Sequence, residues 1–208
     1  GLKINPYSMV LRKIKKKHLI FYTIDNLLKC NLVKHIVITS PDVKILNIVK
    51  KKYKKKIITI KRPEKLANIN TETEKTFKHA LKNINLRKVK YDYILDMSYN
   101  TPFLNSTNIE NSVNTMQIFD ADKVIPVVQE THRYFKHDGN GLKNIVNNVN
   151  LKLERNAIYK HIYCFRLFKK NSFFEKDNKL KIGHVVLSNK ESFELRSEED
   201  LKLFSFFK

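Results

Sequence analysis

The feature that most constrains this chain is a strand-like run at residues 91–97 that ends in a proline-containing loop at residues 98–104. The run begins with alternating residues and then becomes apolar, which predicts a strand buried inside a sheet. Pro102 lacks an amide hydrogen and disfavours a helical Thr101, so the strand must leave the sheet there. Ligands of open α/β sheets bind outside the carboxyl ends of the strands. We therefore expect the segment from Asp96 to Leu104 to form the floor of a site.

Helix-like and strand-like segments alternate around this run. Amphipathic spacing and capping residues predict helices at 19–30, 107–118 and from about 73 onward, and a further helix at 41–52 with Pro41 at its first position and Asp42 in its first turn. Strands are predicted at 35–40, 56–60, 91–97 and 121–128. This alternation is typical of a mostly parallel sheet with helices on both faces. At 208 residues we predict one α/β domain that spans the chain.

The pattern changes after residue 129. The sequence Asp-Gly-Asn-Gly at residues 138–141 predicts a hairpin turn between two extended arms. Further strands are expected at 160–166 and 181–187, and a terminal helix is expected from Ser197. The second half therefore adds strands and a hairpin to the alternating first half.

Composition narrows the class of protein. The net charge of +21 invites a nucleic-acid function, but the basic residues are mostly lysine, accompanied by much asparagine and isoleucine, a usage typical of AT-rich genomes. Arginine, the better reader of bases and phosphates, is scarce, so nucleic-acid binding is a secondary hypothesis and a solvated lysine surface is preferred. The sequence shows no apolar run long enough to span a membrane and no signal-peptide pattern. Cys30 and Cys164 lack metal-ligand spacing, and we expect reduced core thiols in a cytoplasmic protein.

Several segments, taken in order, resemble the cytidylyltransferases that activate acidic sugars. The matching segments are His18–Ile24, His35–Asp42, Arg62–Ala67, Asn100–Leu104, Asp120–Val124, Lys160–Arg166 and Ser192–Leu201. They are similar in order and content to the CMP-sialic-acid synthetases, with the CMP-KDO synthetases as close relatives. The resemblance implies a three-layer, Rossmann-like nucleotidyltransferase fold of the glycosyltransferase-A type. It also implies a reaction of CTP with a sialic-acid-type or KDO-type sugar acid that yields a CMP-sugar and pyrophosphate.

The resemblance implies a set of site residues and partners. Candidates for nucleotide or substrate contact are Arg12, Lys13, Lys15, Arg62, Thr71, Ser98, Asn100, Thr101 and His161. Glu194 is the candidate ligand for Mg²⁺, the implied cofactor. Residues 130–160 correspond to a protruding dimerisation segment, so a homodimer is expected. Each role has a plainer alternative: a surface arginine at Arg62, helix capping at Thr71 or Thr73, and a satisfied strand histidine at His161.

The chain departs from the family pattern in the motifs that bind phosphate, nucleotide and metal. No glycine lies between Gly1 and Gly139, so the glycine-rich phosphate loop of the family is not reproduced near residues 6–15. Ser98 and Leu104 replace the glutamine and arginine of the family loop, and Arg196 replaces the second aspartate of its Asp-x-Asp metal motif. Two explanations stay open. Either the protein is a family member with impaired or lost catalysis, such as a binding or partner protein, or a stretch near residues 6–15 is missing from the sequence.

Overall fold

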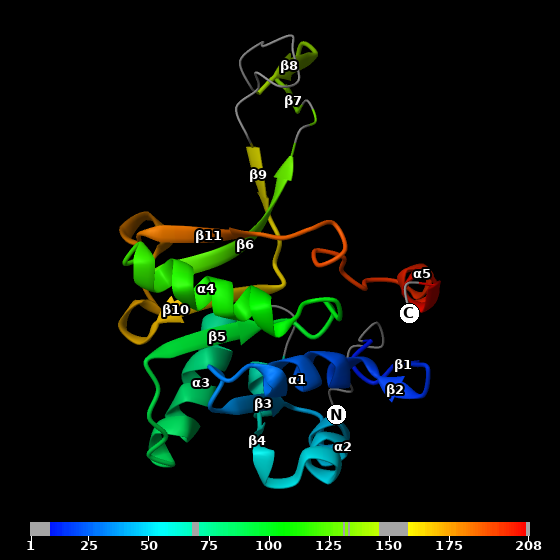
Figure 1. Ribbon diagram of the computed structural model, residues 1–208, viewed down its shortest axis with the longest axis vertical. Coiled ribbons are helices and arrows are strands. Elements are labelled where there is room, and N and C mark those ends of the chain that lie inside the picture. The colour runs from blue at the N-terminus through cyan, green and yellow to red at the C-terminus, as the bar shows by residue number, and fades with distance from the viewer. Residues whose placement is uncertain (1–8, 68–70, 131, 133, 146–157, 207–208) are drawn as a thin grey trace.

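The computed structural model describes residues 9–67, 71–130, 132, 134–145 and 158–206 (Figure 1). The helices are α1 (Leu19–Lys29), α2 (Val43–Tyr53), α3 (Thr73–Leu86), α4 (Ser106–Ile118) and α5 (Glu198–Phe206). The strands of the body are β3 (Ile36–Ser40), β4 (Ile57–Lys61), β5 (Tyr93–Met97), β6 (Lys123–Glu130), β9 (Ile158–His161), β10 (Phe165–Lys169) and β11 (Ile182–Val186). Two small hairpins complete the fold: β1 (Lys13–Ile14) with β2 (Lys17–His18), and β7 (Phe135–His137) with β8 (Leu142–Asn144). In the described part of the chain, no helix is both long and apolar enough to cross a membrane.

The largest sheet confirms the predicted mixed α/β class. Its order is β11-β6-β10-β5, with β9 also paired to β6. Strands β5, β6 and β11 run in one direction, because β10 is antiparallel to both β5 and β6 while β11 is parallel to β6. Helix α4 packs on β6 and β11, and Gly183 permits this approach because an added Cβ would lie 3.1 Å from Thr115 Cγ2. Three of the five strands of this sheet thus run in one direction, and β9 and β10 run in the opposite direction.

The prediction of one continuous strand at residues 160–166 is wrong. The structure has β9 ending at His161 and β10 beginning at Phe165, with a turn between them. His161 pairs with Val127 and Leu167 pairs with Val124, so six residue steps on this side span only three steps on β6. The three extra residues form a large bulge. Beyond this bulge β10 lies between β6 and β5 and pairs with both.

A second, smaller sheet consists of β3 and β4 in parallel. Among the described residues, no backbone ladder joins it to the larger sheet. The two sheets meet instead through a hydrophobic cluster in which buried Ile36 and Ile57 share a core with partly buried Leu95 and Met97 of β5. Helices α1 and α2 contribute most of the other residues of this cluster. Side-chain packing therefore connects the two halves of the alternating region.

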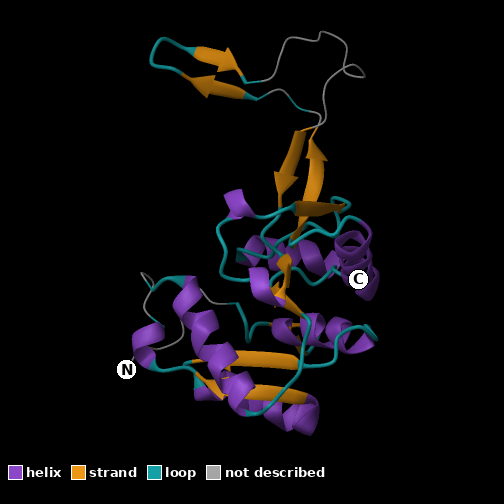
Figure 2. Ribbon diagram, turned by 90° about the vertical axis from the view of Figure 1, so that its left-hand side faces the viewer, coloured by secondary structure: helices purple, strands orange, loops and turns teal. Residues whose placement is uncertain are grey.

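The predicted hairpin at residues 134–142 is present. Gly139 and Gly141 have φ values of 98° and 142°, a region that non-glycine residues rarely adopt, which explains the glycines in this turn. Figures 1 and 2 show β6 and β9 extending from the body as a two-stranded ribbon, with the β7–β8 hairpin beyond its end. The assignment of residues 130–160 as a dimerisation segment stays a prediction, and residues 146–157 lie outside the described part of the chain.

Candidate functional site

The loop after β5, the expected floor of the site, is fastened from two sides. The Ser98 amide donates a hydrogen bond of 2.8 Å to the Cys164 carbonyl, which ties the loop to the bulge before β10. The Thr23 hydroxyl on α1 donates to the Tyr99 carbonyl at 3.2 Å. Backbone groups fixed in this way lose little further entropy when a ligand binds. The loop therefore forms a pre-organised surface at the carboxyl end of β5.

The side chains of this loop divide into polar and buried groups. Ser98 Oγ lies 2.5 Å from Asn100 Oδ1 and donates to it. Thr101 is fully buried, and its hydroxyl has no hydrogen-bond partner among the described residues. Leu104, at the position where the resemblance has an arginine, is 1% exposed and belongs to the core beneath α4. The loop therefore presents Ser98 and Asn100 as polar groups, while Leu104 serves packing.

The segment that carries Glu194 lies directly beside this loop. The Leu195 amide donates to the Asn100 carbonyl at 2.8 Å. Glu194 has a side chain only 15% exposed, and its Oε2 accepts from Arg196 Nε at 2.7 Å and lies 2.6 Å from Arg196 Nη2. Both guanidinium nitrogens thus contact the same oxygen of a mostly buried carboxylate, which makes a charge-assisted pair. The candidate metal ligand is thus already neutralised by its own neighbour.

Glu194 and its neighbour Arg196 do not form a site that fits Mg²⁺. Mg²⁺ in nucleotide-processing sites is held by one or two free carboxylates together with phosphates. Here Glu194 is engaged by Arg196, whose positive charge repels a cation placed near it. Among the described residues, no group of three or more His, Cys, Asp and Glu side chains could hold a metal ion.

The basic candidates lie on the β1–β2 hairpin. Arg12 forms a 2.6 Å ion pair with Glu198 at the start of α5, and Lys13 and Lys15 are exposed. One hydrophobic cluster brings the hairpin, the loop after β5 and α5 together; it contains Met9, Ile14, Leu19, Tyr22, Tyr99, Phe103, Phe193, Leu195, Leu201 and Phe204. Arg12, the loop and Glu194 are therefore neighbours in one region of the molecule, and their role in ligand binding stays a prediction.

Arg62 and Thr71 lie at a different strand end. Arg62 follows β4, is half-buried, and donates from Nη1 to Thr76 Oγ1 on α3 at 3.3 Å. Burial lowers the pKa of the Arg62 guanidinium, and its Nε has no partner among the described residues. Thr71 does not cap α3: its hydroxyl donates to the Lys65 carbonyl at 3.4 Å, and Glu72 is the N-cap residue. The plainer interpretations of a surface arginine and a capping threonine therefore do not describe these two residues.

His161 occupies the end of β9, where it faces positive charges. Its Nε2 is buried without a hydrogen-bond partner among the described residues, and its ring centroid lies 4.2 Å from that of Tyr163. Burial lowers the pKa of His161, and the charges of Lys123 and Arg166 lower it further. The interpretation as a satisfied strand histidine fails, because one ring nitrogen lacks the partner that buried polar atoms normally have.

Sequence reasoning missed the ionic pairs that surround His161. Arg166 on β10 lies opposite Asp96 on β5 in the ladder, and its Nη2 lies 2.5 Å from Asp96 Oδ2. Lys123, 4% exposed, contacts both carboxylate oxygens of Asp177 at 2.7 and 2.9 Å. The available signal was a charged residue inside each apolar strand, since such residues are seldom buried without a partner.

The cytidylyltransferase family model matches residues 9–205. No curated protein matches the sequence at a significant level. Among solved structures, the 4-diphosphocytidyl-2C-methyl-D-erythritol synthase from Anaerococcus prevotii DSM 20548 is 13% identical with a TM-score of 0.68, and 95% of this chain and 92% of that chain are covered. A second 4-diphosphocytidyl-2C-methyl-D-erythritol synthase is 10% identical with a TM-score of 0.70, with 95% and 93% covered. At these identities the structural matches show the fold alone.

Proposed function

Because the chain belongs to the cytidylyltransferase family, we propose that its site beside β5 binds CTP and an acidic sugar, and that CMP transfer is impaired or lost. In the family reaction implied by the resemblance, the anomeric hydroxyl oxygen of the sugar acid attacks the α-phosphorus of CTP. The bond to the β-phosphate oxygen breaks, pyrophosphate leaves, and the hydroxyl proton is released. Such a reaction depends on positioning and on neutralising the leaving pyrophosphate.

The observation that carries this proposal is the pair between Glu194 and Arg196. It lies beside the pre-organised loop, where the family motif would supply two carboxylates to a metal ion. A free carboxylate pair can recruit Mg²⁺ to the triphosphate, whereas a neutral carboxylate–guanidinium pair cannot. Binding of the nucleotide needs only the loop and nearby cations such as Arg12 and Lys13. Charge neutralisation during transfer is the step that the substitution weakens.

The choice of an acidic sugar is supported by the surroundings of His161. Its unpartnered Nε2 is close enough to Lys123 and Arg166 for their charges to depress its pKa. A ligand carboxylate there would accept a charge-assisted hydrogen bond from the ring nitrogen, beside two cations that are already paired with Asp177 and Asp96. A neutral polyol would gain only the hydrogen bond. This reasoning favours sialic-acid-type or KDO-type sugars over uncharged ones.

Two other functions stay in consideration. A non-catalytic protein that binds a nucleotide, sugar or protein partner would share this fold and lack transfer altogether. A nucleic-acid-binding protein would use its lysines, six of which are exposed over Lys50–Lys52 and Lys54–Lys56. That cluster contains no arginine, the residue that best pairs with phosphate in a bidentate manner, so it ranks below the proposed function.

The test measures binding and transfer separately. Calorimetry with CTP, and with sialic, legionaminic, pseudaminic and KDO acids, is expected to detect CTP and at least one sugar acid. His161→Gln is expected to weaken binding of the sugar acid about tenfold or more, since the loss of one charge-assisted contact costs about 1.5–3 kcal/mol. The affinity for CTP is expected to stay unchanged. The exposed His35→Gln variant is the matched control.

Pyrophosphate release is then followed with CTP, Mg²⁺ and each sugar acid. We expect no release above the background with any of them. Release at about 1 s⁻¹ or faster, which is ordinary enzymatic turnover, would contradict the impairment. Failure to bind CTP or any sugar acid would contradict the site itself.

A further inference from the structure

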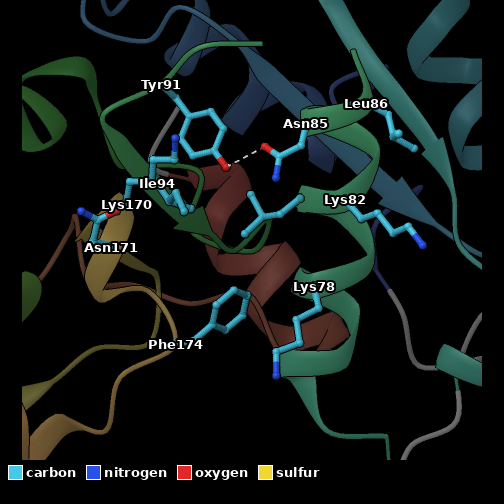
Figure 3. A pocket seen from close by; sticks show the side chains of 10 residues that line it. Lys78, Lys82, Asn85, Leu86, Tyr91, Ile94, Lys170, Asn171 and Phe174 are labelled. Atoms are coloured by element: carbon cyan, nitrogen blue, oxygen red, sulfur yellow. Dashed lines mark hydrogen bonds between the residues drawn. The ribbon is translucent and has the colours of Figure 1, made fainter. Parts of the chain in front are cut away.

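A pocket of about 570 Å³ lies away from the candidate site, between α3, the start of β5 and the short helix Lys170–Ser172 (Figure 3). It is lined near Tyr91 and Ile94, at the amino end of β5, whereas the loop at residues 98–104 follows the carboxyl end. Five strand residues separate the two ends by about 16 Å. The volume falls within the range of small-molecule sites. This pocket therefore lies apart from the loop that is proposed to bind CTP.

The interior of the pocket is apolar and braced. Leu81, Ile94, Phe174 and the ring of Tyr91 supply its walls. Figure 3 shows the Tyr91 hydroxyl directed at Asn85 on α3, and the hydrogen bond to Asn85 Oδ1 measures 3.2 Å. Phe174 is 43% exposed although it forms one wall of this depression. Apolar surface left open in a concave site is surface that a ligand can cover with a gain of free energy.

Two ammonium groups stand over the aromatic walls. Lys170 Nζ lies 4.9 Å from the centroid of Tyr91, and Lys78 Nζ lies 5.2 Å from the centroid of Phe174. These cation–π contacts hold both charges at the mouth of the pocket. A third lysine, Lys82, lines the outer side, and no acidic residue is among the lining residues. Lys78 also contacts Glu74, but both side chains are more than half exposed and such pairs are weak.

We propose that this pocket binds a small organic anion with a flat apolar body, of the aromatic carboxylate type. The body would cover Leu81, Ile94 and Phe174, and the carboxylate would lie beside Lys170 Nζ at the Tyr91 end of the pocket. Lys78, at the opposite end beside Phe174, would add attraction over a longer distance (Figure 3). A neutral aromatic molecule would gain no electrostatic attraction from Lys170, or from Lys78, whose contact with Glu74 is weak. A hydrophilic anion such as inorganic phosphate would leave the apolar walls open to water. The combination of walls and charges selects for a ligand with both properties.

The probe is 2-naphthoate, titrated into the full chain by calorimetry, with uncharged 2-naphthamide as its partner compound. We expect saturable binding of 2-naphthoate and at least about tenfold weaker binding of 2-naphthamide, because the amide carries no charge for the lysines to attract. Lys78→Glu with Lys170→Glu is expected to reduce 2-naphthoate affinity more than about tenfold. Lys51→Glu with Lys55→Glu changes the net charge equally on another surface and is expected to retain binding.

A second variant keeps the test decisive if the double charge reversal fails to fold. Phe174→Ala removes one exposed wall without altering charge and is expected to weaken 2-naphthoate by about tenfold, the cost of one lost aromatic contact. Circular dichroism and the thermal midpoint verify that each variant is folded. The proposal is overturned if wild-type protein does not bind 2-naphthoate at millimolar concentration, if 2-naphthamide binds equally well, or if folded pocket variants retain full affinity.

Discussion

The surroundings of His161 predict how the stability of the folded protein depends on pH. Burial and the charges of Lys123 and Arg166 lower the pKa of its ring below the ordinary value. The folded protein therefore binds a proton at this site less readily than the unfolded chain does, and stability is lost as the pH falls through the unfolded pKa of about 6.5. Urea unfolding at about pH 7.5 and about pH 5.5 should show the lower stability at the acidic value.

The His161→Gln variant isolates this contribution. Glutamine keeps a polar side chain and cannot titrate, so the loss of stability between these two pH values should shrink. The exposed His35→Gln variant should retain the wild-type pH dependence. An unchanged pH dependence in His161→Gln would mean that this residue does not carry the effect.

At the scale of single elements, the β1–β2 hairpin carries unusual backbone conformations. Its two-residue turn consists of Lys15 and Lys16, with φ values of 47° and 68°. A turn with positive φ at both central residues favours Asn followed by Gly, and non-glycine residues in this region cost about 1 kcal/mol each. The double substitution Lys15→Asn with Lys16→Gly should therefore stabilise the protein by about 1 kcal/mol and raise the thermal midpoint by about 2–4 °C. A lower midpoint would show that the lysine side chains contribute contacts that outweigh the strain.

Local patterns predicted most elements because each rests on its own residues. The predicted helix at 19–30 is observed at Leu19–Lys29. The helix predicted at 41–52 begins two residues later, at Val43, so Pro41 lies outside it and Asp42 is its side-chain cap. The predicted strand at 160–166 failed, since its interruption depends on β10 reaching β5 across the sheet. The ion pairs around His161 were missed for a similar reason. Arg166 meets Asp96 through the register of β10 on β5, and Lys123 meets Asp177 of a short helix 54 residues further along the chain, and no local pattern encodes either contact.

At the scale of the whole molecule, the chain has the fold of the cytidylyltransferase family, and the proposed loss of CMP transfer rests on a few residues of the candidate site. The loop at residues 98–104 was expected to form the floor, and it is anchored to both α1 and the bulge before β10. The ion pair of Glu194 with Arg196 could not be predicted as a contact, although the sequence placed a cation where a carboxylate was needed. The net charge of +21 is a separate property of the molecule, carried mainly by lysine.

The most direct test of the central claim is the dependence of CTP binding on Mg²⁺, measured by thermal shift. If the Glu194–Arg196 pair excludes the metal, CTP should raise the thermal midpoint of the wild-type protein equally with and without Mg²⁺. Arg196→Asp restores a second carboxylate and should add a Mg²⁺-dependent rise of a few degrees, as about tenfold tighter binding adds about 1.4 kcal/mol. Lys55→Asp makes the same charge change on a distant exposed surface and should add none. A clear Mg²⁺-dependent shift in the wild-type protein would contradict the account.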